Sequence, residues 1–186
     1  MPSVSISSQS STSSLPIMQK CTVVNLDAPN TPTSQIPGYF NPKQIKIGKS
    51  IPWSGHPSKS NDYEMLEFTC GKNQTMTVEL FFDGYEQGIN VQQCFVFPLI
   101  ELTRPTVKDT SGKGGAKRPP FVMIVWGKFF PFKGVIDSID TDYTMFLPDG
   151  TPVRATCTLK LTEVDVAQMN SGAKSRVEQR QRDAGY

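Results

Sequence analysis

Apolar and polar residues alternate regularly in two segments of the chain. The even-numbered positions are apolar from Met76 to Phe82, and the odd-numbered positions are apolar from Val153 to Leu161. Successive side chains of a β-strand point to opposite faces of the sheet. The alternation therefore predicts two strands with one buried face each, over residues 75–82 and 153–163.

Residues 121–126, with the sequence FVMIVW, are apolar on both faces. We expect a strand here that is either central in a sandwich or covered on its second face by a partner. A further strand is predicted over residues 129–139, where Phe132 and Ile136 share a face. A short strand-like run also extends from Gln19 to Leu26.

A tight turn is predicted where the sequence reads Leu-Pro-Asp-Gly-Thr, at residues 147–151. The proline presets the first turn angle, and Gly150 tolerates the positive φ of a bulged hairpin. We therefore expect residues 142–147 and 153–163 to be adjacent antiparallel strands. Alanine at position 150 is expected to destabilise the fold by about 1 kcal/mol or more, because a Cβ is disfavoured in that conformation.

One helix is predicted after the first alternating strand. Asn90 is a suitable N-cap, and Val91, Leu99 and Leu102 recur at helical spacing. Pro98 lies inside this segment and is expected to kink or shorten the helix.

Four segments have the composition of loops or tails. Residues 1–16 are rich in serine and are predicted to be a disordered arm. Residues 27–63 and 108–120 are predicted to be mostly extended loop, and the second of these is basic and mobile. Residues 165–186 are expected to form a polar C-terminal arm that is too polar to bury a core face. The remaining residues, 17–164, are predicted to form one β domain.

Composition limits the possible functions. The chain has 186 residues, of which 37% are hydrophobic, and a formal net charge of +2. This charge is too small to indicate nucleic-acid binding, and no apolar run is long enough to predict a membrane span. The N-terminal segment lacks the apolar core of a secretory signal. The four cysteines have no CxxC spacing, which predicts reduced, buried thiols with no metal site.

Few residues are candidates for catalysis. His56, the single histidine, has no evident carboxylate or nucleophile beside it, so we expect a surface or loop-packing role. Gly48-Lys49-Ser50 lacks the earlier glycine of a phosphate-binding loop. Asp83 and Glu86 follow a strand, where acidic residues are usually solvated or capping groups. The sequence predicts a binding or assembly protein with no catalytic residue, cofactor or metal.

Six segments carry a resemblance to a known family. They are IPW at residues 51–53, Glu67-Phe68, TVELFFDGYEQG at residues 77–88, Arg118-Pro119-Pro120 leading to Trp126-Gly127, FKGVI at residues 132–136, and YTMFLPDGTPVRA at residues 143–155. In this order they resemble the tube-domain family of contractile injection systems. Within it, they are most similar to the baseplate adaptor that often carries a LysM module after the tube fold.

The resemblance implies a mainly β fold with one helix, a tail-tube-like two-sheet barrel or sandwich that assembles into a homo-hexameric ring. Such a ring joins the spike or hub protein to the inner-tube protein, contacts baseplate wedge proteins and helps to initiate tube assembly. The family's role is structural, which implies no catalysis, no nucleic-acid partner and no direct membrane insertion. Assembly is expected in the bacterial cytoplasm, within a contractile particle.

The matching segments also supply candidate assembly residues, and the C-terminal segment supplies three more: Phe81, Phe82, Asp83, Tyr85, Trp126, Phe132, Tyr143, Phe146, Gly150, Arg176, Arg180 and Tyr186. The residues after Val164 are too few for a LysM module. We expect them to act instead as a contact arm that becomes ordered on assembly, with Tyr186 as an aromatic anchor. Two alternative interpretations are an inner-tube protomer of the same particle and a soluble ligand-binding β-barrel.

Overall fold

The computed structural model describes most of the chain, namely residues 19–28, 34–56, 63–108, 116–165, 167, 169 and 171–184. Three predictions fall wholly or mainly outside these residues. They are the serine-rich N-terminal arm, the mobile character of the loop over residues 108–120, and the anchoring role of Tyr186.

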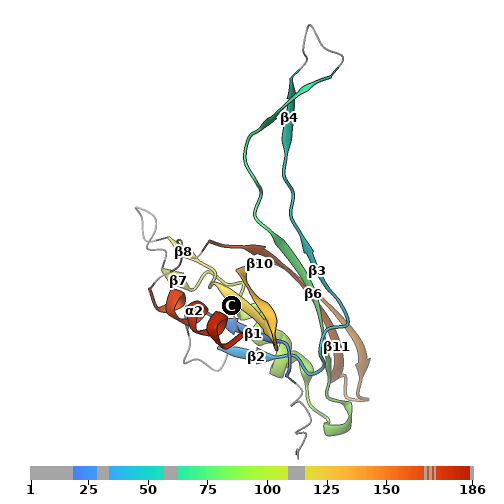
Figure 1. The fold of residues 1–186 in the computed structure, drawn as a ribbon. Coiled ribbons are helices and arrows are strands. Elements are labelled where there is room, and N and C mark those ends of the chain that lie inside the picture. Colours follow the sequence, from blue (N-terminus) through green and yellow to red (C-terminus); the bar gives the residue numbers. More distant parts are fainter. Residues whose placement is uncertain are drawn as a thin grey trace, which may run out of the picture.

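The fold is built on one antiparallel seven-stranded sheet with the strand order β2-β1-β9-β10-β11-β6-β3 (Figure 1). These strands are, in chain order, β1 (Thr22–Asn25), β2 (Gln35–Pro37), β3 (Ile45–Gly48), β6 (Thr75–Asp83), β9 (Val122–Trp126), β10 (Phe129–Phe146) and β11 (Pro152–Glu163). The strands β4 (Trp53–His56) and β5 (Met65–Phe68) form a separate pair, as do β7 (Val107–Lys108) and β8 (Lys117–Arg118).

The helical elements are η1 (Tyr85–Gln87), a 3-10 turn, η2 (Gln92–Val96), a π-helical segment, and two α-helices, α1 (Phe97–Glu101) and α2 (Ser171–Ala184). The predicted mainly β fold is therefore confirmed. Two details differ from the expectation: the chain has a second α-helix, and the strand pairings between described residues form one curved sheet rather than a closed barrel.

Both alternating segments form the expected half-buried strands. In β6 the even-numbered side chains from Met76 to Phe82 are fully buried, and in β11 the odd-numbered ones from Val153 to Leu161 are fully buried. Leu80 lies opposite Cys157 in the register that joins the two strands. This register places both apolar faces on the same side of the sheet, where they form the main core.

The strands predicted over residues 129–139 and 142–147 are parts of one 18-residue strand, β10. It pairs with β11 along most of its length, and the register shifts between Ile136 and Ser138 and again near Met145. Such bulges add a residue to one strand and bend it. They explain why the apolar alternation is interrupted although the strand continues.

The predicted helix begins at its expected cap. The Asn90 side-chain oxygen accepts a hydrogen bond from the Gln92 backbone N–H at 3.0 Å. Val91, Leu99 and Leu102 are buried against the main core, as their spacing predicts. The first turns are π-helical, and the short helix α1 has its proline in the first turn. A wider turn before Pro98 is consistent with a residue that lacks the N–H of a regular helix.

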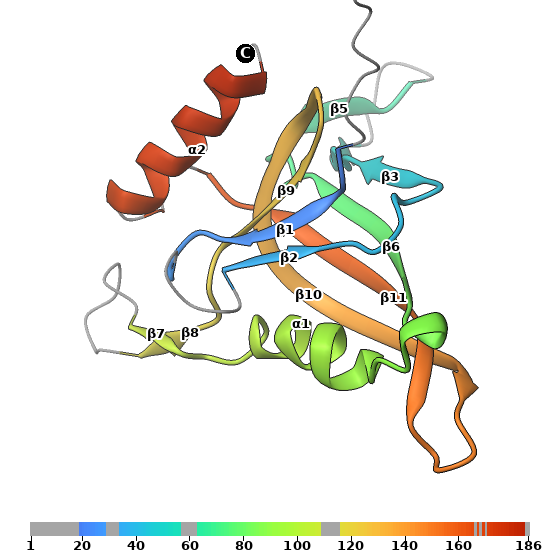
Figure 2. The same ribbon diagram turned by 90° about the horizontal axis from the view of Figure 1, so that it is seen from below.

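The second face of β9 is covered by the chain's own helix α2. Figure 2 shows α1 and α2 on opposite sides of the sheet. Ala173 and Val177, one turn apart on α2, are fully buried in a second cluster that includes Phe121 and Met123. The expectation that residues 165–186 are too polar to bury an apolar face is therefore wrong, because Met169, Ala173 and Val177, spaced four residues apart, are buried in this cluster.

A buried ion pair holds β8 against the end of β1. The Arg118 guanidinium donates hydrogen bonds to both carboxylate oxygens of Asp27, at 2.8 and 3.2 Å. The Phe121 backbone N–H donates to the same carboxylate at 2.8 Å, and the guanidinium lies 3.7 Å from the centre of the Phe121 ring. The Asp27 side chain is only 2% exposed. Arg118 thus has a structural role in the described fold.

Candidate functional site

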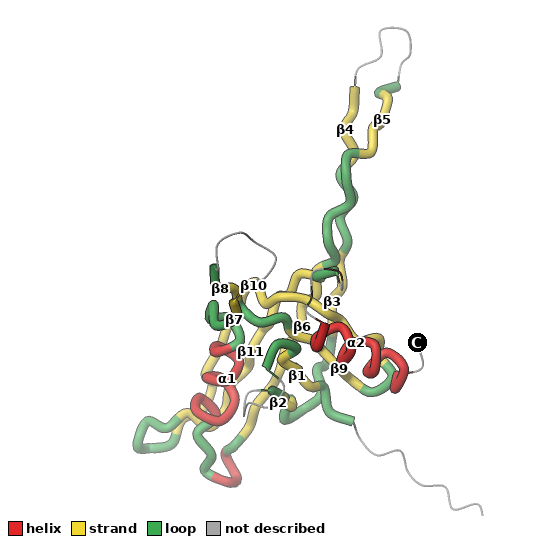
Figure 3. Tube along the Cα trace, turned by 90° about the vertical axis from the view of Figure 1, so that its left-hand side faces the viewer, coloured by secondary structure: helices red, strands yellow, loops and turns green. Residues whose placement is uncertain are grey.

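A long hairpin leaves the edge of the sheet and projects away from the body of the protein (Figures 1 and 3). We call residues 49–56 and 63–72 the hairpin arm. It follows β3 and leads back into β6, and its outer part is the pair β4 and β5, in which Trp53 lies opposite Phe68. Every residue of β4 and β5 is exposed.

The hairpin arm presents large apolar side chains to solvent. Trp53 is 56% exposed, Leu66 is 65% exposed and Phe68 is 55% exposed. The Trp53 and Phe68 rings contact each other, with their centres 5.6 Å apart, and both side chains remain more than half exposed. A two-stranded hairpin without a core of its own is at most marginally stable in water, and clustered exposed apolar residues typically mark an interaction site.

His56 lies on this hairpin arm. Its Nε2 atom is 3.0 Å from Oε2 of Glu67 on the opposite strand, and both side chains are largely exposed. His56 therefore does have a carboxylate beside it, that of Glu67, which the sequence did not indicate. It lies on the surface of an extended hairpin, away from the described clefts. The expected surface location of His56 is therefore confirmed.

Two turns meet at the other end of the sheet and form what we call the acidic tip, residues 83–87 and 146–154. The Gly84 backbone N–H donates to the carbonyl oxygen of Val153 at 2.8 Å, which joins the turns. Asp83, Glu86 and Asp149 outnumber the single cation, Arg154, so the tip has a formal net charge of −2. Tyr85 and Phe146 are each at least half exposed beside these charges.

The turn between β10 and β11 has the predicted geometry. Gly150 has a φ of +85°, and its N–H donates to the Leu147 carbonyl at 2.9 Å. The Asp149 carboxylate accepts a hydrogen bond from the Thr151 N–H at 3.0 Å. This bond is the main cause that lowers the pKa of Asp149, so the tip keeps this negative charge at neutral pH.

Asp83 is held in a geometry that favours its charged form. Its carboxylate accepts hydrogen bonds from the Tyr85 backbone N–H at 3.1 Å and from Arg154 at 2.6 and 3.0 Å. The Tyr85 hydrogen bond is the larger cause that lowers the pKa of Asp83, and Arg154 adds to it. Asp83 thus ties the two turns together rather than standing free for proton transfer.

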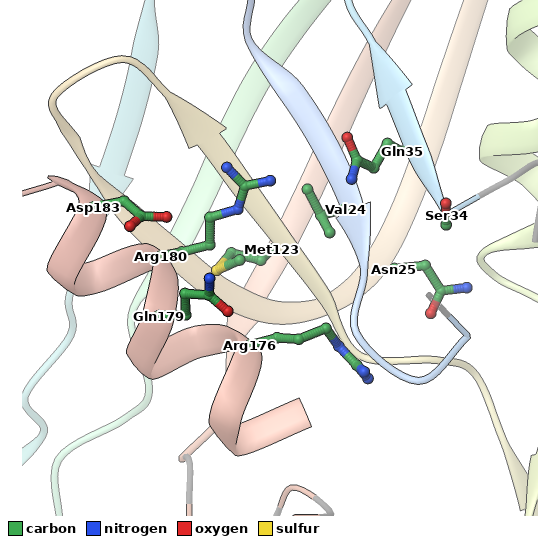
Figure 4. A pocket seen from close by; sticks show the side chains of 9 residues that line it. All are labelled: Val24, Asn25, Ser34, Gln35, Met123, Arg176, Gln179, Arg180 and Asp183. Atoms are coloured by element: carbon green, nitrogen blue, oxygen red, sulfur yellow. The ribbon is translucent and has the colours of Figure 1, made fainter. Parts of the chain in front are cut away.

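A cleft of about 320 Å³ opens between α2 and the sheet (Figure 4). Val24 on β1 and Met123 on β9 lie on its sheet side, and Arg176 and Arg180 extend into it from α2. It therefore contains two of the predicted assembly residues. The Arg176 Nε atom is buried without a hydrogen-bond partner in the described part of the chain. Such a donor favours an acceptor brought by a ligand or partner.

Four other candidate assembly residues belong to the main core. Phe82 and Phe132 are at most 2% exposed, and Trp126 and Tyr143 are partly buried against the same cluster. Burial raises the pKa of Tyr143, with a smaller contribution from Cys157. These four side chains stabilise the fold. Phe81 points to the opposite face, where its ring centre lies 5.5 Å from that of the half-exposed Phe40.

The cysteines divide into two groups. Cys21 and Cys157 are buried, as expected of small apolar residues, whereas Cys70 and Cys94 are exposed, contrary to expectation. All four are free thiols. Burial raises the pKa of Cys21 to about 11, so its thiol stays protonated at neutral pH. Among the described residues, no group of His, Cys, Asp and Glu is placed to hold a metal ion.

The apolar residues of the hairpin arm were not predicted from the sequence as site residues. Trp53 and Phe68 stand within segments that carried the family resemblance, but Met65 and Leu66 do not. The available signal was compositional. Large apolar side chains recur in a stretch otherwise rich in Ser, Gly and Pro, which supplies no alternation that would bury them.

A family model described as contractile injection system tube protein matches residues 18–171. The match spans the whole sheet, the hairpin arm, the acidic tip and the first residue of α2. No curated protein matches the chain. In the part of the chain that the structure describes, no helix is long and apolar enough to cross a membrane.

Proposed function

Because the chain belongs to the contractile injection system tube protein family, we propose that it forms a ring in the baseplate of such a particle. In this proposal six copies form the ring, which joins the spike or hub to the inner tube and helps to initiate tube assembly. The role is structural. Wedge proteins of the baseplate contact the ring from outside, and no reaction is catalysed.

The observation that supports self-assembly most strongly is the exposed hairpin arm. Trp53, Leu66 and Phe68 would lose an unfavourable contact with water if a neighbouring subunit covered them. Because the hairpin projects from the body, it can reach a neighbour without any change in its own domain (Figure 3). The hairpin arm therefore has the features of an assembly element rather than of a core strand.

The two edges of the main sheet provide a second argument. The strands β2 and β3 each pair on one side only within the described residues. Unpaired strand edges tend to pair with another chain, and closure into a ring removes them. A curved sheet that is open in one subunit can thus become part of a continuous wall when several subunits associate.

An inner-tube protomer is the second candidate function, and the description of the matching family favours it directly. Both functions use the same fold and the same kinds of contact between subunits. They differ in copy number, because a baseplate adaptor contributes one ring to each particle whereas a tube protomer contributes many stacked rings. Quantitative counting of the chain per purified particle distinguishes them.

The test of self-assembly is a double substitution on the hairpin arm. We expect Trp53→Ser combined with Leu66→Ser to leave the melting temperature nearly unchanged, since both side chains are exposed and outside the core. We expect the same variant to be absent from assembled particles. Phe97→Ser, which removes an exposed aromatic side chain from α1, serves as the control. Normal incorporation of the folded double variant contradicts the proposal.

A further inference from the structure

The cleft beneath α2 and the acidic tip carry opposite charges and belong to the same chain. We propose that the acidic tip of one copy docks in the cleft beneath α2 of the next copy. The inference rests on the proposed ring and specifies one of its contacts. It assigns a partner to Arg176 and Arg180, which form no ion pair with any residue in the described part of the chain.

The cleft offers hydrogen-bond donors above an apolar floor. Arg176 and Arg180 lie one turn apart on α2, so both guanidinium groups face the same opening (Figure 4). Helix α2 as a whole carries four cations and two carboxylates, which gives it a net charge of +2. Asp183 is the one carboxylate in the lining. The unpaired Arg176 Nε atom adds a buried donor that an incoming oxygen atom would satisfy.

The acidic tip supplies complementary groups. Its net charge of −2 is opposite in sign to the +1 of the charged side chains that line the cleft, and the Asp149 carboxylate remains ionised because the Thr151 N–H stabilises it. Phe146 is 56% exposed next to these charges. An aromatic ring of this kind can contact Val24, which keeps a small exposed surface at the cleft floor, since apolar contacts of aromatic rings are favourable.

The positions of the two surfaces fit a repeating contact between copies. Helix α2 and the turn between β10 and β11 lie on opposite sides of the molecule in the views of Figures 1 and 2. A tip on one side and a cleft on the other cannot meet within one chain. They form a head-to-tail contact, which closes into a ring when the rotation between subunits permits it.

The test is a charge swap in cells that assemble the particle, with the yield of particles as the measurement. Arg180→Glu and Asp149→Arg, each as the only copy of the chain, are expected to lower the yield at least tenfold. The combined variant is expected to recover to within about threefold of wild type. Arg182→Glu makes the same charge change on α2 outside the cleft lining, and is expected to assemble normally.

Melting curves establish that each variant folds, and Glu86→Arg provides a tip substitution that keeps the hydrogen bond between Asp149 and Thr151. Normal yield with Arg180→Glu overturns the inference while the ring itself stands. A lowered particle yield with Arg180→Glu that Asp149→Arg does not restore also overturns the inference. It indicates that an acidic segment of a different baseplate protein occupies the cleft. Absence of the wild-type chain from any ring contradicts the proposed function instead.

Discussion

Replacement of Gly150 by alanine tests the turn on which the acidic tip is built. Gly150 has a φ of +85°, and a Cβ added there meets no heavy atom within 4 Å. A steric clash therefore contributes nothing to the loss of stability in Gly150→Ala, and the whole loss comes from the backbone conformation. For a residue with a Cβ, a left-handed conformation costs roughly 1–2 kcal/mol.

Gly71 provides a matched control in the same protein. A Cβ at position 71 also meets nothing within 4 Å, and its φ lies outside the positive range. Alanine at either position restricts the unfolded chain by the same amount, which by itself stabilises the protein by about 0.4–1 kcal/mol. This contribution cancels when the two variants are compared. Gly150→Ala is expected to be less stable than Gly71→Ala by about 1–2 kcal/mol.

Urea denaturation followed by circular dichroism measures this difference. The midpoints of the two transitions are compared at equal slope, which reports stability directly. Equal midpoints for Gly150→Ala and Gly71→Ala would refute the assignment of strain to the turn. If the free energy of unfolding of Gly150→Ala falls with urea at a different slope from that of Gly71→Ala, the substitution alters the compactness of the native or the denatured state and not only one backbone angle.

Three further substitutions test other parts of the structure. Arg118→Ala is expected to lower the free energy of unfolding by about 3 kcal/mol, because it leaves the Asp27 carboxylate buried without its cation. This value is the lower end of the range for a broken buried ion pair, since the Arg118 side chain is itself 21% exposed. Urea denaturation measures the loss, and a loss below about 1 kcal/mol contradicts the prediction. The lowered pKa of Asp83 stabilises the folded state above the unfolded pKa, near 3.8, and this contribution is lost as the pH falls through the lower folded pKa. The stability advantage of wild type over Asp83→Asn should therefore shrink between pH 6 and roughly pH 2, a range that brackets the ordinary Asp pKa, and a constant difference in melting temperature would argue against it. His56→Ala is expected to leave the contraction of assembled particles unchanged, because its only described side-chain partner is the exposed Glu67; a folded, assembled particle that cannot contract would oppose this expectation.

The sequence predicted those parts of the fold that bury one face of a regular element. The alternation in β6 and β11 and the turn at Gly150 are local patterns, and each has a direct physical cause in the chain geometry. The continuity of β10 could not be predicted in the same way, because the bulge between Ile136 and Ser138 interrupts the alternation of apolar and polar residues.

Two elements could not be predicted from the sequence, for opposite reasons. Among the α2 side chains that the structure describes, only Ala173 and Val177 are fully buried, so the helix has too little apolar surface to stand out among its charged residues. In the hairpin arm Trp53 and Leu66 are apolar but exposed, so a search for buried faces passes over them. Of the residues that line the cleft beneath α2, Arg176 and Arg180 were predicted from their charge to be contact residues. Their placement in a cleft depends on tertiary packing that no local pattern encodes.

A single reconstruction tests whether the chain forms a ring between spike and inner tube. An electron cryomicroscopy reconstruction of the assembled particle, with this chain located in its density, gives the copy number and the neighbours at once. We predict six copies in one ring at the baseplate, with each hairpin arm covered by a neighbouring subunit. A single unpaired copy, or three copies, at that position would contradict the account.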